Sequence, residues 1–136
     1  MNSLLLSEAD LSRLHAIHDH QSPPPFPSSD QRAVLAALLP AMGVTANILT
    51  LGVHVGFHDQ VSLVSPTDPT DDFRLRIVMP HEADPGSSLI SVLAPLSLAL
   101  IGRKRGELVT WAANGALREM RITSISKHPA EEPALL

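Results

Sequence analysis

The chain has no cysteine and no tyrosine, and aromatic residues make up only 3% of its 136 residues. The absence of cysteine excludes disulfide bonds, thiolate catalysis and metal sites with cysteine ligands. The scarcity of aromatic rings argues against a platform on which the bases of single-stranded nucleic acid could stack. Hydrophobic residues still make up 44% of the chain, so a core can form, built mainly from aliphatic side chains.

An excess of positive charge is also missing, because the formal net charge is −4. Dedicated DNA-binding proteins normally carry a basic excess, so this balance favours a protein partner. The longest apolar run, from Ser91 to Gly102, is too short to cross a bilayer and contains Pro95. The N-terminal stretch MNSLLLSEADL lacks the positive region of a signal peptide. We therefore expect a cytoplasmic monomer that makes no contact with membranes.

The N-terminal third predicts two helices joined by a proline-rich loop. Ser7 with Asp10, and Ser28 with Gln31, have the spacing of capping boxes at helix starts. The stretch PPPFP between the helices cannot be helical, and Pro40 should end the second helix. We expect residues 1–46 to form a short antiparallel helical hairpin, a small coiled coil that projects from the rest of the chain. The alternative is that both helices cover one face of a sheet.

From residue 47 onward the hydrophobic pattern changes to a period of two, which is typical of β-strands. Asn114-Gly115 between two such stretches is a strong hairpin signal. We expect an α+β fold in which residues 47–126 form an antiparallel sheet with one short helix, followed by a loose tail at 127–136. The expected strands cover approximately residues 53–57, 61–64, 73–79, 89–92, 107–113 and 117–125.

The stretch ISVLAPLSLALIGRKRG places a proline and a basic triplet at the two ends of an apolar run. Proline is favoured in the first turn of a helix, so Pro95 should begin a two-turn helix that Gly102 ends. Arg103, Lys104 and Arg105 would then offset the helix dipole at its C-terminus. Three charges on an acidic chain make a weak nucleic-acid patch, and we favour the rim of a protein interface.

The histidines and the sequence motifs give little support for a metal site or for catalysis. His15, His18 and His20 lie near the end of the first helix, where positive charge is favourable without a metal. His54 and His58 would lie roughly 13 Å apart on a strand, too far to share one ion. Phosphate-binding loops, nucleophile elbows and zinc-protease motifs are missing from the sequence. We expect no enzyme activity, no cofactor and no metal.

The segment from Glu82 to Glu107, with the pattern EADPxxxxISVxxPxxxALIGxxxGE, resembles the C-terminal domain of the Gre transcript-cleavage factors. The resemblance covers residues 53–126 and implies an FKBP-like sheet that wraps around one short helix. It also implies binding to RNA polymerase beside its secondary channel. The partner-binding surface that it indicates consists of Leu93, Ala94, Pro95, Leu96 and Ser97, with Arg103 at the rim.

Within this surface we expect Ala94, Pro95 and Ser97 to be exposed. Glu82 and Asp84 are expected to structure their loop by capping backbone N–H groups, rather than to touch a partner.

Three departures from the Gre pattern modify the expected activity. Ala94 and Leu98 stand where Gre factors typically carry serine and arginine, and the predicted hairpin is short and lacks an acidic tip. These features are similar to the Rnk group, Gre-like proteins named as regulators of nucleoside diphosphate kinase. The resemblance implies a protein that occupies the Gre site, and so competes with Gre factors, without stimulating cleavage. A true cleavage factor, a prolyl isomerase, and a regulator of another protein such as nucleoside diphosphate kinase remain alternatives.

Overall fold

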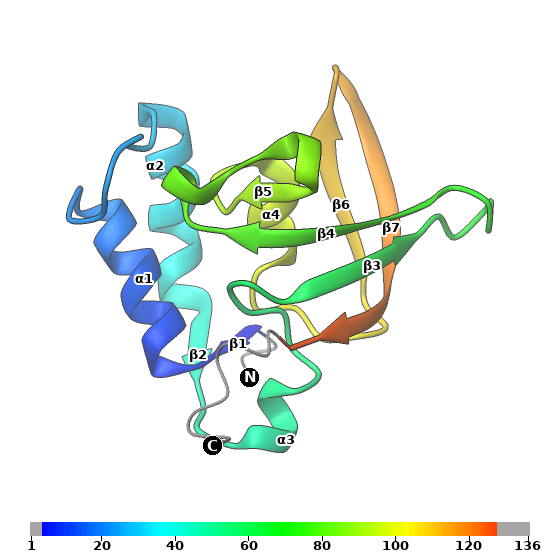
Figure 1. The fold of residues 1–136 in the computed structure, drawn as a ribbon, viewed down its shortest axis with the longest axis horizontal. Helices are drawn as coiled ribbons and strands as arrows, with labels where there is room; N and C mark the ends of the chain where they lie inside the picture. Colours follow the sequence, from blue (N-terminus) through cyan, green and yellow to red (C-terminus); the bar gives the residue numbers. More distant parts are fainter. Residues whose placement is uncertain (1–3, 128–136) are drawn as a thin grey trace.

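A computed structural model describes residues 4–127 of the chain, and Figure 1 shows an α+β fold with a curled sheet and few helices. The strands are β1 (Leu4–Leu6), β2 (Met42–Val44), β3 (Gln60–Val64), β4 (Asp72–Val78), β5 (Leu89–Ser91), β6 (Leu108–Ala113) and β7 (Ala116–Ser126). The α-helices are α1 (Glu8–His18), α2 (Ser29–Leu38), α3 (Ile48–Leu51) and α4 (Pro95–Leu100). Short 3-10 turns cover Leu39–Ala41, Pro80–Glu82 and Pro85–Ser87. None of the helices within residues 4–127 is long and apolar enough to cross a membrane.

The first two helices begin where the capping residues predicted. The Ser7 hydroxyl accepts a hydrogen bond from Asp10 N at 3.1 Å, and Ser28 and Gln31 form a complete capping box. The Asp10 carboxylate does not complete the first box, because it accepts a hydrogen bond from Phe57 N instead. The second helix ends at Leu38, directly before the 3-10 turn that contains Pro40.

The helical pair does not project from the rest of the molecule, and that prediction was wrong. Helices α1 and α2 run antiparallel to each other in Figure 1, and their base is closed by a parallel pairing of β1 with β2. Leu14, Ile17 and Leu35 from these helices are fully buried and belong to the same hydrophobic core as the sheet. The two helices therefore pack on the sheet domain, which a semi-detached coiled coil would not do.

The main sheet has the strand order β5-β4-β3-β7-β6. Its pairs are antiparallel except β4–β5, which is parallel, so the expectation of a wholly antiparallel sheet needs this correction. A register shift between Ser62 and Leu63, where β3 pairs with β7, marks an irregularity that adds to the curl of the sheet. The inward face carries aliphatic side chains such as Val61, Leu75 and Ile122, as the composition predicted.

The strand predicted over residues 53–57 is absent, and a turn with one isolated bridge, His54 to Lys104, takes its place directly after α3 (Ile48–Leu51). Asn47 Oδ1 accepts hydrogen bonds from Leu49 N at 2.9 Å and Thr50 N at 3.2 Å, which starts the unpredicted helix α3 just before this turn. The turn still buries Val55 and Phe57, so the apolar residues were correctly assigned to the core but not to a ladder.

The C-terminal elements follow the sequence signals closely. Asn114 and Gly115 have φ angles of 54° and 79°, as a two-residue turn between β6 and β7 requires. Pro95 occupies the first position of α4, and Gly102 follows the helix with a φ of 81°. Of the predicted tail at 127–136, Lys127 is described and ion-paired, and the remainder lies outside the described residues.

Candidate partner-binding surface

The N-terminal end of α4 presents an exposed proline between partly and fully buried neighbours. Pro95 is exposed, whereas Ala94 and Leu96 are half-buried. Leu93 is 4% exposed and Ser97 is 0% exposed, so the expectation that Ser97 faces solvent was wrong. Ser97 and Leu100 lie on one face of α4 at i and i+3 spacing, and this face points into the core. A partner can therefore reach Pro95 directly but not Ser97.

A groove runs beside Pro95 and is shared by three elements, of which α2 lies far in the sequence from α4 and β6. Its lining residues are Asp30, Gln31 and Val34 from α2, Leu93, Pro95, Leu98 and Ala99 around α4, and Thr110, Trp111 and Ala112 from β6. Gln31 Nε2 donates a hydrogen bond to Leu93 O at 3.3 Å, which joins α2 to the chain just before α4. The candidate surface thus includes an N-terminal helix as well as the sheet domain.

The walls of the groove are mainly apolar. Val34 is 51% exposed, although its position on α2 suggested a core residue. The Trp111 ring is held from β7 by Arg118, whose guanidinium carbon lies 5.8 Å from the ring centroid. Among the lining residues that the structure describes, Asp30 is the one with a charged side chain. An apolar groove with a single acid suits a protein segment that carries an apolar side chain beside a basic one.

Arg103 lies at the other end of α4 and does not line this groove. Its Nε donates to Ala99 O at 3.3 Å, and its Nη1 lies 3.8 Å from Glu107 Oε1. The first contact places a cation on a C-terminal carbonyl of the helix, as the dipole argument predicted. The structure therefore separates Arg103 from the other predicted contact residues by the length of α4.

Glu82 and Asp84 both accept hydrogen bonds within their own loop, and Glu82 also contacts His58 of a neighbouring turn. Glu82 Oε1 accepts hydrogen bonds from Met79 N at 3.0 Å and from His58 Nε2 at 2.8 Å. Partial burial opposes the charged form of Glu82, but these hydrogen bonds outweigh it and hold its pKa below the usual value. Asp84 Oδ2 accepts a hydrogen bond from the Ser87 hydroxyl at 3.0 Å. Their carboxylates are thus occupied with loop contacts.

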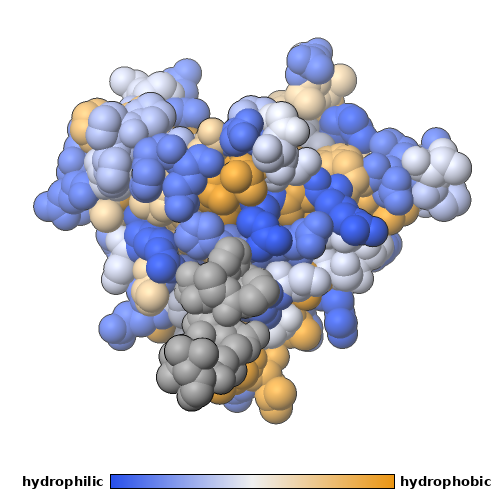
Figure 2. Space-filling view, in the orientation of Figure 1, coloured by the Kyte–Doolittle hydropathy of each residue, from blue (hydrophilic) through white to orange (hydrophobic). Residues whose placement is uncertain are grey.

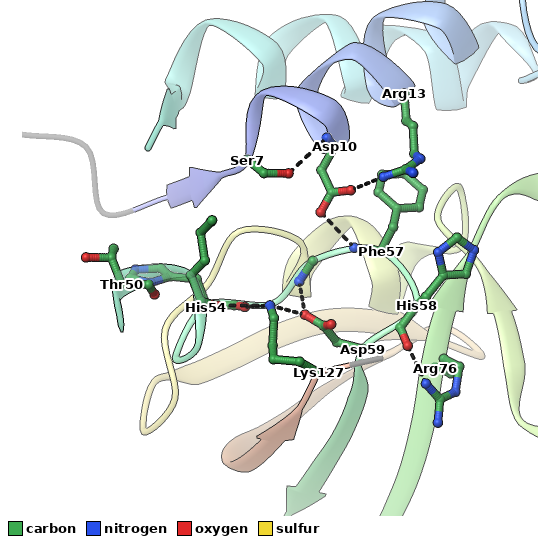
Figure 3. A network of polar contacts seen from close by, with 12 residues as sticks. Ser7, Asp10, Arg13, Thr50, His54, Phe57, His58, Asp59, Arg76 and Lys127 are labelled. Carbon is green, nitrogen blue, oxygen red and sulfur yellow. Dashed lines mark hydrogen bonds and ion pairs between the residues drawn. The ribbon is translucent and has the colours of Figure 1, made fainter. Parts of the chain in front are cut away.

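A polar network, shown in Figure 3, holds α1 against the turn that follows α3. Asp10 Oδ2 accepts from Phe57 N at 3.1 Å, and Asp59 Oδ2 accepts from the preceding amide, Gly56 N, at 2.7 Å. Lys127 Nζ lies 2.5 Å from Asp59 Oδ2. Burial raises the pKa of Asp59, while the ion pair with Lys127 opposes that shift. The network fixes the helical pair and thereby one wall of the groove.

Other residues considered for chemistry are scattered. Within residues 4–127 no group of three histidine, aspartate or glutamate side chains is placed to hold a metal ion. His18 Nδ1 lies 2.8 Å from Asp19 Oδ1, and this contact lowers the pKa of Asp19. Phe57, Trp111 and Phe73 line three separate cavities and do not form a common aromatic pocket.

Residues 52–127 match the model of the family described as transcription elongation factor GreA/GreB, C-terminal. The chain belongs to this family. The matched segment contains the loop of Glu82 and Asp84, α4 and the β6–β7 hairpin, which is where the sequence pattern placed the resemblance.

Curated relatives in the family are named transcription elongation factor GreA. The chain is 34% identical over 74 residues to the protein from Phenylobacterium zucineum and 38% identical over 74 residues to that from Caulobacter vibrioides. Each match covers 54% of this chain and 46% of the relative. The chain therefore spans about half the length of the curated relatives it matches.

Solved structures extend the similarity in fold to the N-terminal helices. The transcription elongation factor GreA/GreB from Nitrosomonas europaea superposes with a TM-score of 0.73 at 24% identity, covering 93% of this chain and 100% of that chain. The GreA factor homolog 1 (Gfh1) protein of Thermus thermophilus has a TM-score of 0.50 at 18% identity, covering 92% and 99%. At these identities the likeness concerns the fold alone.

The contribution of α2 and β6 to the groove is not predicted by the sequence pattern. Val34 follows the apolar pattern of α2 with Leu35, yet one helix face cannot bury two adjacent side chains equally, and Leu35 is the buried one. Two features of the sequence could have indicated the groove. Val34 lies at the edge of the apolar face of α2, and Trp111 is a large aromatic residue on β6, an edge strand of the sheet.

Proposed function

We propose that this chain is a transcription regulator that binds RNA polymerase beside its secondary channel, through the groove at the start of α4. The observation that carries the proposal is the exposed Pro95 beside an apolar groove, within the segment that matches the GreA/GreB C-terminal family. A rigid proline at a helix start loses little conformational entropy on docking, which favours its use as a contact.

We propose further that the chain competes with Gre factors without stimulating transcript cleavage. Helix α1 has 11 residues, which corresponds to a length of about 16 Å. Both helices pack on the sheet domain instead of extending away from it. The loop between them, residues 19–28, carries a single carboxylate, Asp19, which lies 2.8 Å from His18 Nδ1. It therefore offers no cluster of acids that could hold a metal ion at a remote active site.

The proposal includes a place for the chain in the Rnk group of Gre-like proteins. Ala94 and Leu98 depart from the typical Gre residues, and the helices are short. We take the protein to be a cytoplasmic, non-enzymatic monomer without cofactor or metal, whose sheet domain is FKBP-like in shape. The separation of Phe57, Phe73 and Trp111 gives no support to a prolyl isomerase site.

The proposed surface is tested by measuring the affinity of the chain for core RNA polymerase. Pro95→Glu places a charge at the groove, and a glutamate is well tolerated in the first turn of a helix, so the variant should fold. We expect it to bind at least about tenfold more weakly than the wild type. Leu117→Glu is the matched control, because Leu117 is 76% exposed on β7 and does not line the groove. Equal affinity of both variants and the wild type would exclude this surface.

The alternative function, regulation of nucleoside diphosphate kinase, can be distinguished with the same purified chain. If the wild-type chain fails to bind core RNA polymerase but changes the activity of purified nucleoside diphosphate kinase, the polymerase proposal is wrong. Our proposal predicts polymerase binding and an unchanged kinase rate when the two purified proteins are mixed.

A further inference from the structure

A second exposed surface lies at the end of the molecule that carries α3. Ile48 and Leu49 are 81% and 85% exposed, which makes them the most exposed large hydrophobic residues of the part described, 4–127. Figure 2 shows hydrophobic atoms at this end, and in Figure 1 it lies opposite the N-terminal end of α2, which lines the groove. The Asn47 side chain caps both Leu49 N and Thr50 N, so the two side chains stand on a fixed helical turn.

Single exposed aliphatic residues are normal on protein surfaces and need no partner. The arrangement here differs because two of them are adjacent and almost fully exposed. Val44, a third exposed aliphatic residue, ends β2 shortly before them and is 50% exposed. A fixed turn that presents adjacent apolar side chains to water is suited to binding another molecule that would cover them.

The basic turn between α4 and β6 is bonded to the segment that follows α3. Val55 N donates to Arg103 O at 2.8 Å, and Arg105 N donates to Val53 O at 2.8 Å. These bonds hold Lys104 and Arg105 next to the segment that leaves α3. The basic triplet is thereby joined by backbone hydrogen bonds to the chain that continues from the apolar turn of α3.

The charges of Lys104 and Arg105 are not compensated by carboxylates of the described chain. Both side chains are exposed, and neither has an ion-pair partner among residues 4–127. The nearby Glu107 is engaged elsewhere, because it accepts from Lys104 N at 2.5 Å and faces Arg103 Nη1 at 3.8 Å. Free positive charge therefore gathers here, on a chain whose formal net charge is −4.

We propose that Ile48, Leu49, Lys104 and Arg105, the α3 patch, form a second docking surface for an acidic amphipathic segment of a protein partner. Leucine-like side chains of such a segment would cover Ile48 and Leu49, and its carboxylates would pair with Lys104 and Arg105. An anionic membrane is a poorer match, because lipid recognition uses clusters of about four to eight basic residues.

The test uses the whole chain, labelled with nitrogen-15, and a synthetic amphipathic helix with leucine on one face and glutamate on the other. A matched peptide carries lysine in place of every glutamate. We expect amide shifts at residues 48–51 and 104–105 with the acidic peptide, weakened by added salt, and none with the basic peptide. The proposal is overturned if the two peptides bind alike, if the shifts map to the groove of α4, or if the acidic peptide produces none.

Substitutions then assign the contacts. Leu49→Ser and Arg105→Glu should each weaken binding of the acidic peptide about tenfold. Leu117→Ser and Arg74→Glu alter an exposed leucine and an exposed arginine elsewhere, and should leave it unchanged. Unchanged affinity of Leu49→Ser for the acidic peptide would contradict the proposal. So would a wild-type chain that cosediments with phosphatidylglycerol vesicles but does not bind the acidic peptide. No polymerase is used, so the result is independent of the proposed function.

Discussion

Gln31 Nε2 donates a hydrogen bond to Leu93 O at 3.3 Å, across 62 residues of sequence. The same Gln31 side chain closes the capping box of α2 through Ser28 N. One side chain thus starts an N-terminal helix and fixes that helix to the chain that enters α4. The groove is therefore formed by the helical pair together with residues 52–127, the segment that matches the family.

Removing this side chain should cost more than removing the cap alone. We expect Gln31→Ala to lower the free energy of unfolding by about 1–2 kcal/mol, because it loses both hydrogen bonds. Ser28→Ala, which loses the cap but keeps the Leu93 contact, should cost about 1 kcal/mol. Urea unfolding measures both. A smaller effect for Gln31→Ala than for Ser28→Ala would show that the contact with Leu93 O adds nothing.

Gly56 allows two carboxylates to approach consecutive backbone amides. A Cβ at this position would lie 2.6 Å from Asp10 Oδ2 and 3.2 Å from Asp59 Oδ2. Gly56→Ala should therefore displace Asp10 from Phe57 N and destabilise the fold by about 1–3 kcal/mol. Gly86→Ala is the control, since its nearest contact would be at 3.6 Å. Similar thermal stability of the two variants would argue against the close approach.

The buried carboxylate of Asp59 predicts a pH dependence of defined sign. Burial and the neighbouring Asp10 raise its pKa above the ordinary 3.8, against the opposing effects of Lys127 and Gly56 N. The folded chain then binds more protons than the unfolded chain between the two pKa values. The contribution of Asp59 to stability is fully present below the unfolded pKa and is lost as pH rises through the folded pKa.

Asp59→Asn isolates this contribution, because other titrating groups cancel in the comparison. The difference in free energy of unfolding, wild type minus variant, should fall as pH rises above 3.8. Urea unfolding at a series of pH values gives the curve. A difference that grows with pH over the same window would mean that the pKa of Asp59 is lowered by folding.

Lys127 offsets part of the unfavourable burial of Asp59. Its Nζ also donates to Leu51 O at 2.9 Å and His54 O at 3.2 Å. Lys127→Met should destabilise the fold by about 1–2 kcal/mol, less than for fully buried pairs, because the Lys127 side chain is 39% exposed. In the background of Asp59→Asn the loss should be smaller. Equal losses in both backgrounds would show that the pair is not coupled.

The sequence was most informative where a local signal agreed with the tertiary structure. The caps at Ser7 and Ser28, the proline at the start of α4 and the Asn-Gly turn each dictate backbone geometry over a few residues. The alternation from Val53 to Phe57 misled because burial in a turn and burial in a strand leave the same apolar pattern. The parallel β1–β2 pair and the contact between Asp10 and Phe57 N depend on distant packing, which no local pattern encodes.

The candidate site was predictable in part for the same reason. A helix start at Pro95 follows from its neighbours, but the inward direction of Ser97 depends on how α4 packs on the sheet. The groove wall formed by Val34 and Trp111 depends on α2 lying beside β6. Docking of the helical pair on the sheet domain therefore decides the shape of the site.

Transcript cleavage in stalled elongation complexes that contain a limiting amount of GreA decides whether the chain competes with GreA without cleaving. We expect that adding the wild-type chain reduces cleavage, that Pro95→Glu does not, and that the chain alone produces no cleavage above the intrinsic rate. Stimulation of cleavage by the chain alone, or an unchanged GreA-dependent rate at saturating wild-type chain, would contradict this expectation.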